Sequence, residues 1–208
     1  MKRRQILLGS LAVTALAIPL VGGAGGSAHA QSVEIFPDDR ILGAAEAPLT
    51  IIEYSSLTCP HCAALHGNAL PRIKETWIAD GRARLVFRHY PLDGLALRAA
   101  AVANCIDGAR FFGFLDLLFQ TQQRWARAQD PMQSLSQTAR LAGMSPGQFD
   151  SCVADEAEMD KILTRAQHGS KTFDVESTPT MIVNGRKVEG ARSFEEFDEI
   201  FAKIAAGT

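Results

Sequence analysis

The sequence predicts an α/β fold into which a large, all-helical segment is inserted. Towards the N-terminal side, a short buried strand is followed by a helix and a second strand. Towards the C-terminal end, a hairpin is followed by an amphipathic helix. Between these parts, the stretch from Pro91 to Ser177 carries helix signals but no convincing strand pattern, and it is far too long for a plain loop.

Residues 1–30 have the pattern of a secretory signal peptide. A basic segment at residues 2–4 precedes an apolar run at residues 6–21, and small residues then lead to a cleavage site that we expect after Ala30. A membrane anchor is disfavoured because this run is shorter than the ~20 residues that a spanning helix needs. Arg3 and Arg4 also resemble a twin-arginine motif, so both Sec and Tat export stay open. We expect a protein that works outside the cytoplasm.

Charge and cysteine content limit the classes of partner. The chain has 21 Lys and Arg residues against 23 Asp and Glu residues, and the predicted leader removes positive charges only. The mature part is therefore acidic, so we expect neither nucleic acid nor an anionic membrane surface as a partner. All four cysteines follow residue 30, and an even number in an oxidising compartment favours disulfides.

The first α/β unit is predicted from its hydrophobic pattern. Leu49 to Tyr54 form an apolar, β-branched run typical of a buried strand, and Arg84 to Tyr90 alternate as a second strand. The helix between them is expected to start near Cys59 and to continue to Ile78, with a kink at Pro71. Two closely spaced cysteines therefore lie at the corner between the strand and the helix.

The C-terminal elements complete a known order. Thr180 to Val183 and Arg186 to Glu189 flank an Asn-Gly turn, which is a strong hairpin signal. Ser193 and Glu196 form a capping box that opens the last helix. Strand, helix, strand, hairpin and helix is the order of the thioredoxin fold.

The inserted segment is predicted to be helical throughout. Asp130 and Ser145 each precede a proline, as the N-cap residue of a helix often does. The run from Phe111 to Phe119 is apolar on nearly all sides, so we expect it at the centre of a small core of its own. The division that follows is a thioredoxin domain in two parts, 31–92 and 177–208, around a helical subdomain at 93–176.

The motif Cys59-Pro60-His61-Cys62 favours thiol redox chemistry. Its position at a helix start lets unpaired backbone N–H groups stabilise the thiolate of Cys59. Pro60 constrains the small disulfide ring, and the imidazole of His61 is a candidate donor to the first sulfur. A stabilised thiolate stabilises the reduced pair, which makes the disulfide more oxidising.

The alternatives for this pair are a structural bridge or half of a zinc site, with His66 as a third ligand. A second close pair of cysteines or histidines is missing from the sequence, so we expect no metal and no other cofactor. His66, His89 and His168 form no ligand pattern and are interpreted as ordinary surface or core residues.

With this motif, the chain resembles the DsbA family of thiol-disulfide oxidoreductases, from about Leu49 to Ile204. The resemblance implies that Thr178-Pro179 is the cis-proline loop facing the active-site cysteines; a plain trans-proline at a strand start is the alternative. It also implies that Glu53 is a buried carboxylate beneath Cys62, able to take up and return its proton, the alternative being a solvated strand residue.

Two further features follow from the resemblance. Thr178 departs from the valine of the best-studied oxidase in the family and matches related isomerases. Cys105 and Cys152 resemble the second disulfide of some alphaproteobacterial members, with two buried free cysteines as the alternative. Such a bridge would stabilise the fold by about 4 kcal/mol in the chain-entropy model. We interpret it as structural, not catalytic.

The function that the resemblance implies is a periplasmic dithiol oxidase. It would donate the Cys59–Cys62 disulfide to reduced secreted or periplasmic proteins and be reoxidised by a DsbB-like membrane quinone reductase. A disulfide isomerase or reductase is the nearest alternative, and a non-enzymatic metal-binding module is the next. The segment from Gln31 to Ala47 is too short for the oligomerisation region of such isomerases, so we expect a monomer.

Overall fold

The computed structural model describes residues 33–106 and 108–207. The predicted signal peptide at 1–30 lies outside these residues. No helix within the described ranges is both long and apolar enough to cross a membrane.

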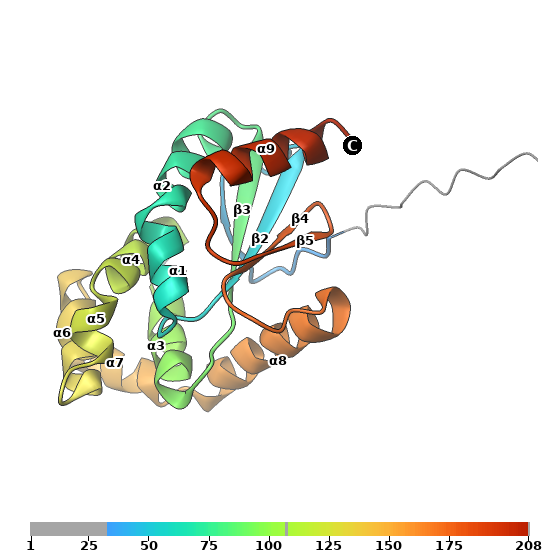
Figure 1. Cartoon of the computed structure of the whole chain (residues 1–208). Helices are drawn as coiled ribbons and strands as arrows, with labels where there is room; N and C mark the ends of the chain where they lie inside the picture. Colours follow the sequence, from blue (N-terminus) through green and yellow to red (C-terminus); the bar gives the residue numbers. More distant parts are fainter. Residues whose placement is uncertain (1–32, 107, 208) are drawn as a thin grey trace, which may run out of the picture.

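The chain forms an α/β structure in which five strands of the described residues make one sheet (Figure 1). The elements are β1 (Arg40–Leu42), β2 (Leu49–Ser55), α1 (Pro60–Gly67), α2 (Ala69–Ile73), the π-helix η1 (Lys74–Ile78), β3 (Ala83–His89), α3 (Gly94–Asn104), α4 (Gly108–Gln120), α5 (Gln122–Ala126), α6 (Pro131–Leu141), α7 (Pro146–Val153), α8 (Glu156–Phe173), β4 (Thr180–Val183), β5 (Arg186–Glu189) and α9 (Phe194–Ala205).

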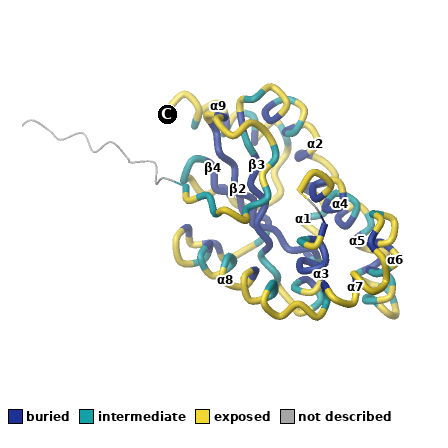
Figure 2. Tube along the Cα trace, turned by 180° about the vertical axis from the view of Figure 1, so that it is seen from behind, coloured by how far each residue is buried: buried dark blue, intermediate teal, exposed yellow. Residues whose placement is uncertain are grey.

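The strand order is β1-β3-β2-β4-β5, with β2 and β3 parallel and the other pairs antiparallel. β2 is buried along its whole length, which explains its continuous apolar run (Figure 2). Because side chains alternate along a strand, Ile52 and Tyr54 face the end of α8, whereas Ile51 packs into the core beneath α1, α2 and α9. Glu53 shares that second face, the face of the cysteine pair.

β1 is not predicted by the sequence, because three residues are too few for an alternating pattern to show. It pairs antiparallel with β3, with Arg40 opposite Phe87. The expected single helix from Cys59 to Ile78 is also wrong in detail, since the structure divides it into α1, α2 and η1. The break falls at Asn68, one turn before Pro71, whose missing N–H cannot continue the hydrogen-bond ladder.

Helices α6 and α7 of the inserted segment begin at the N-cap residues that the sequence predicts. The carboxylate of Asp130 caps α6, and Ser145 forms a capping box with Gln148 at the start of α7. The expectation of a separate small core is wrong: the aromatic residues of α4 belong to the same apolar cluster as the sheet residues and α1. α4 packs against α1 and β1, so its apolar surface extends the main core.

The C-terminal hairpin and helix form as the sequence predicts. Asn184 and Gly185 both have positive φ angles, 45° and 85°, as the tight turn between β4 and β5 requires. The Asn184 side chain also accepts a hydrogen bond from the backbone N–H of Thr50, which ties the turn to β2. Ser193 and Glu196 form the capping box of α9.

Gly169 marks a close approach of α8 to the sheet. A Cβ atom at this position would lie 2.5 Å from Cε1 of Tyr54, whose hydroxyl is held by Arg88 at 2.9 Å. Gly169→Ala is therefore expected to lower the free energy of unfolding by about 1–3 kcal/mol, measured by urea denaturation. Gly113→Ala is the control, because its Cβ meets nothing within 4 Å. Equal effects of the two substitutions would contradict the predicted clash.

Candidate active site

The two closely spaced cysteines lie where β2 passes into α1. Cys59 is the N-cap residue of α1, and its N–H donates to the carbonyl of Ser56 at 3.1 Å. Cys62 follows in the first turn, and both are free thiols in this structure. Cys59 is 6% exposed and Cys62 is fully buried, so the first sulfur is the more accessible to a reaction partner.

The local environment separates the acidities of the two thiols. The pKa of Cys59 is lowered to about 5, chiefly because the Cys62 thiol donates a hydrogen bond to it. The Thr178 side chain and the backbone N–H groups of Cys62 and His61 also lower this pKa, against the opposing effect of burial, although the Thr178 hydroxyl oxygen makes no direct hydrogen bond within the part of the chain that the structure describes. Burial, followed by the neighbouring Cys59, raises the pKa of Cys62 far above its ordinary value. At neutral pH the pair therefore holds one thiolate and one thiol.

The loop before β4 covers the pair. The Thr178–Pro179 peptide bond is cis, and the Thr178 carbonyl oxygen lies 3.4 Å from Cys59 Sγ, from which it accepts a hydrogen bond only when Cys59 is protonated. Pro60 and His61 are exposed. It is the backbone N–H of His61 that supports the thiolate here, and the role that we expect of its imidazole stays a prediction.

The reactivity of Cys59 should follow this environment. Its alkylation by iodoacetamide is expected to have a midpoint near pH 5 and to fall about tenfold per pH unit below it. Thr178→Val removes the hydroxyl beside the sulfur and should raise the midpoint by at most about one unit, because even a full hydrogen bond to a charged group is worth only roughly 1.5–3 kcal/mol. An unchanged midpoint in Thr178→Val would show that the hydroxyl does not act on the thiolate.

Glu53 lies on β2 and is fully buried. Its Oε1 accepts a hydrogen bond from the Ser55 hydroxyl and lies 2.9 Å from Nε2 of His66. Its Oε2 has no hydrogen-bond partner among the described residues. The Ser55 hydroxyl also acts to lower the pKa of Cys62, so it lies close to both the carboxylate and the second sulfur.

Two residues of this site are not identified by the sequence. His66, one turn beyond Cys62 on α1, is buried against Glu53 instead of being an ordinary histidine. Gln122 of α5 is buried, and its amide donates to the carbonyls of Leu57 and Cys59, each at 2.9 Å. Both contacts join residues that are distant in sequence, and no local pattern signals them.

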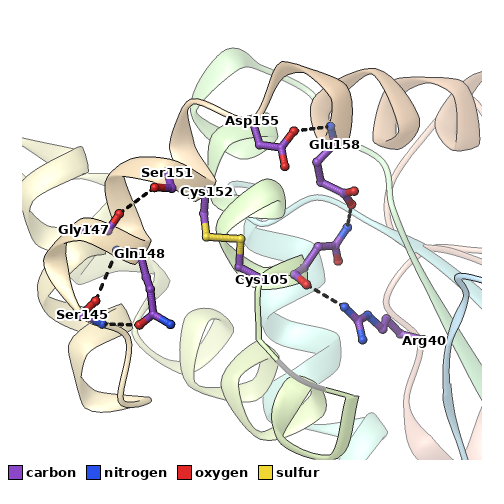
Figure 3. Close-up of a disulfide and its surroundings, with 10 residues drawn as sticks. Arg40, Cys105, Ser145, Gly147, Gln148, Ser151, Cys152, Asp155 and Glu158 are labelled. Atoms are coloured by element: carbon purple, nitrogen blue, oxygen red, sulfur yellow. Dashed lines mark hydrogen bonds between the residues drawn. A yellow bond between two sulfur atoms is a disulfide. The ribbon is translucent and has the colours of Figure 1, made fainter.

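Cys105 and Cys152 are joined by a disulfide between the end of α3 and α7 (Figure 3). It borders a cavity of about 470 Å³ that Arg110 and Met144 also line. None of its lining residues belongs to the Cys59–Cys62 site. Within residues 33–106 and 108–207, no group of three or more His, Cys, Asp or Glu side chains is placed to hold a metal ion.

Comparison with known sequences places the chain in a family. A family model described as Thioredoxin matches residues 36–203. A protein of Rickettsia bellii, provisionally named a protein-disulfide oxidoreductase, is 27% identical over 157 residues, which are 75% of this chain and 61% of the relative. The chain spans between 54% and 61% of the length of the Rickettsia relatives that it matches.

Solved structures agree with the family match. Alpha-DsbA1 of Wolbachia pipientis superposes with a TM-score of 0.76 at 29% identity, covering 83% of this chain and 93% of that one. BdbD of Bacillus subtilis superposes with a TM-score of 0.72 at 20% identity, covering 81% and 94%, which is a likeness of fold alone. The chain therefore belongs to the thioredoxin family and has the DsbA-like form of its fold.

Proposed function

We propose that this protein is a thiol-disulfide oxidoreductase of the dithiol oxidase type, which donates the Cys59–Cys62 disulfide to reduced proteins. The observation that carries the proposal is the position of Cys59 at the start of α1, more exposed than Cys62, where its environment favours a thiolate beside a thiol that keeps its proton. The names of the Rickettsia and Wolbachia relatives support the same class of chemistry.

The acidity of Cys59 has a redox consequence. With a pKa of about 5, the thiolate is favoured roughly a hundredfold at pH 7. Relative to an ordinary thiol, this stabilises the reduced pair by about 3 kcal/mol, or roughly 60 mV for a two-electron couple. A disulfide whose reduction is favoured in this way is readily transferred to the thiols of substrate proteins.

The reaction has two exchange steps. A substrate thiolate attacks Cys59 Sγ, the Cys59–Cys62 bond breaks, and Cys62 takes up one proton. A second substrate thiolate then attacks the substrate sulfur of the mixed disulfide, and Cys59 leaves as a thiolate. The substrate loses two electrons and two protons; the enzyme gains two electrons and one proton, and the other proton enters the solvent.

The remaining site residues support these steps in our proposal. Thr178 and Pro179 cover the sulfurs, while Pro60 and His61 shape the exposed side of the ring. Glu53 exchanges the proton of Cys62 through Ser55, as their hydrogen bonds allow. The Cys105–Cys152 bridge takes a structural role.

For the cellular setting, we propose a monomer that is exported to the periplasm by a Sec or Tat signal. Reduced secreted or periplasmic proteins would be its substrates, and a DsbB-like membrane quinone reductase would restore its disulfide. The likeness to alpha-DsbA1 of Wolbachia pipientis supports this setting.

The redox equilibrium with glutathione tests the oxidase proposal. The couple is expected to be more oxidising than the glutathione pool, to be absent in Cys59→Ser, and to persist in the double variant Cys105→Ser/Cys152→Ser. A strongly reducing couple that is lost with Cys59 would instead establish a reductase or isomerase.

Isomerase activity is the second candidate, favoured by the Thr178 hydroxyl beside both sulfurs. Recovery of a scrambled, multi-disulfide test protein distinguishes it from simple oxidation. An isomerase restores native pairing without added oxidant, whereas an oxidase only forms new bonds from reduced chains.

A further inference from the structure

A line of polar groups leads from the buried thiol towards the surface. Ser55 acts on the Cys62 thiol and donates a hydrogen bond to Glu53, and Glu53 Oε1 lies 2.9 Å from His66 Nε2. On the other side of the ring, Nδ1 of His66 lies 3.2 Å from Oδ1 of Asp116 on α4. The line thus joins β2, α1 and α4 around one imidazole.

Asp116 brings this line to the edge of the protein. Its side chain is 32% exposed, and its two oxygens accept hydrogen bonds from Lys74 Nζ at 2.7 and 2.9 Å. The His66 side chain is only 1% exposed. Its ring stacks on Phe119 with centroids 3.9 Å apart and meets the edge of Phe87. The imidazole is therefore held in one orientation, with a carboxylate at each nitrogen.

The groups facing His66 favour its charged form. Glu53 from β2 and Asp116 from α4 are both acidic, Lys74 of η1 reaches the ring only through Asp116, and β3 contributes the uncharged Phe87. Burial alone disfavours an imidazolium, but the two carboxylates outweigh it and raise the pKa of His66. In turn, His66 and Lys74 hold the pKa of Asp116 low against the opposing effect of burial.

A buried carboxylate needs such a partner. An ionised group in an apolar core is costly unless an opposite charge and hydrogen bonds compensate it. The only cation in contact with Glu53 among the described side chains is His66.

We propose that His66, held by Asp116, is the positioning residue that keeps the Glu53 carboxylate aligned to accept the proton of Cys62. The inference rests on the proposed redox function, in which Cys62 must lose its proton to close the disulfide. His66 touches neither sulfur in the described contacts and acts through Glu53. The first cysteine, whose thiolate depends on other donors, is independent of it.

Reaction of the reduced protein with excess oxidised glutathione separates the two cysteines. Cys59 first attacks glutathione disulfide in a bimolecular phase and releases one glutathione thiolate. Cys62 then attacks Cys59 Sγ in a unimolecular phase and releases the second. Stopped-flow measurement of both phases across pH follows each thiol on its own.

His66→Gln is expected to slow the second phase at least tenfold at pH 7, because Glu53 loses the partner that aligns it as the base for Cys62. In the wild type the rate of this phase should reach a plateau, because an aligned base accepts the proton of Cys62; in the variant the rate should keep rising about tenfold per pH unit. Asp116→Asn, at a partly exposed position, should shift the profile in the same direction by less. The bimolecular phase and the alkylation midpoint of Cys59 should not change.

His89→Gln is the matched control, since His89 is also buried but contacts Asn104 and has no bond to Glu53. The His89→Gln variant should show the same plateau in the rate of the second phase as the wild type. Equal slowing of both phases in His66→Gln, or the same change in His89→Gln, would show that His66 is merely structural. Unchanged pH profiles in both His66→Gln and Asp116→Asn would also overturn the proposal. These outcomes do not depend on whether the glutathione equilibrium finds an oxidising or a reducing couple.

Discussion

Cys59→Ser is expected to reduce disulfide transfer to a reduced test peptide by roughly a thousandfold or more, because it removes the sulfur that substrates attack. Cys59 is the more exposed thiol of the pair, and its environment stabilises it as a leaving group. The rate of peptide oxidation by the preoxidised protein, followed by chromatography, measures the loss.

Cys62→Ser is the informative companion. It leaves Cys59 with a neighbouring hydroxyl donor, so the first thiol should stay reactive. This variant should accumulate a stable mixed disulfide with substrates, because no second protein thiol is present to resolve it. Mixed disulfides that form on Cys62 in Cys59→Ser, and not on Cys59 in Cys62→Ser, would reverse the assignment of roles.

Asp39→Ala is expected to lower the free energy of unfolding by about 3–5 kcal/mol, because it leaves the buried guanidinium of Arg88 without its charge partner. Arg88 donates from Nε and Nη2 to the two carboxylate oxygens of Asp39 at 3.0 and 2.7 Å. The side chains of this pair are 1% and 3% exposed. Arg88 also donates to the Tyr54 hydroxyl and to the carbonyl of Glu34, so it fastens the segment before β1 to the sheet.

The neighbouring Asp38 provides the control for this prediction. It pairs with Arg165, but its side chain is 56% exposed. Asp38→Ala should therefore cost at most about 1 kcal/mol in the same urea titration. A double variant Asp39→Ala/Arg88→Leu should recover part of the loss, because it removes the unpaired charge. Similar losses for Asp38→Ala and Asp39→Ala would contradict the assigned burial cost.

The sequence predicted those parts of the fold whose signals are local. The turn at Asn184 and Gly185, the capping box of Ser193 and the caps at Asp130 and Ser145 each depend on residues a few positions apart. Three other features depend on packing between distant segments, so no short sequence pattern predicts them. They are β1, the break at Asn68 and the shared core of α4. The confirmed α/β class with its helical insertion rests on the first kind of signal.

The same distinction holds for the site. The spacing of Cys59 and Cys62 is visible in the chain itself, whereas the contacts of His66 depend on α4 packing against α1. Its partners Glu53 and Asp116 lie 13 and 50 positions away in the sequence, so no periodic pattern relates them to His66. Its environment becomes clear only when the sheet and the helices are assembled.

Gln122 bears on how this fold could be engineered. Its buried amide serves the carbonyls of Leu57 and Cys59, so a residue of the helical region completes the turn that presents the reactive sulfur. A chimera that replaces helices α3–α8 with those of a relative would have to retain an amide donor at this point. The helical region is therefore not an interchangeable module. Shortening it to a minimal thioredoxin would leave the Leu57 carbonyl unpaired beside the nucleophile, and the Cys59 carbonyl would keep only the N–H of Ala63 as a donor.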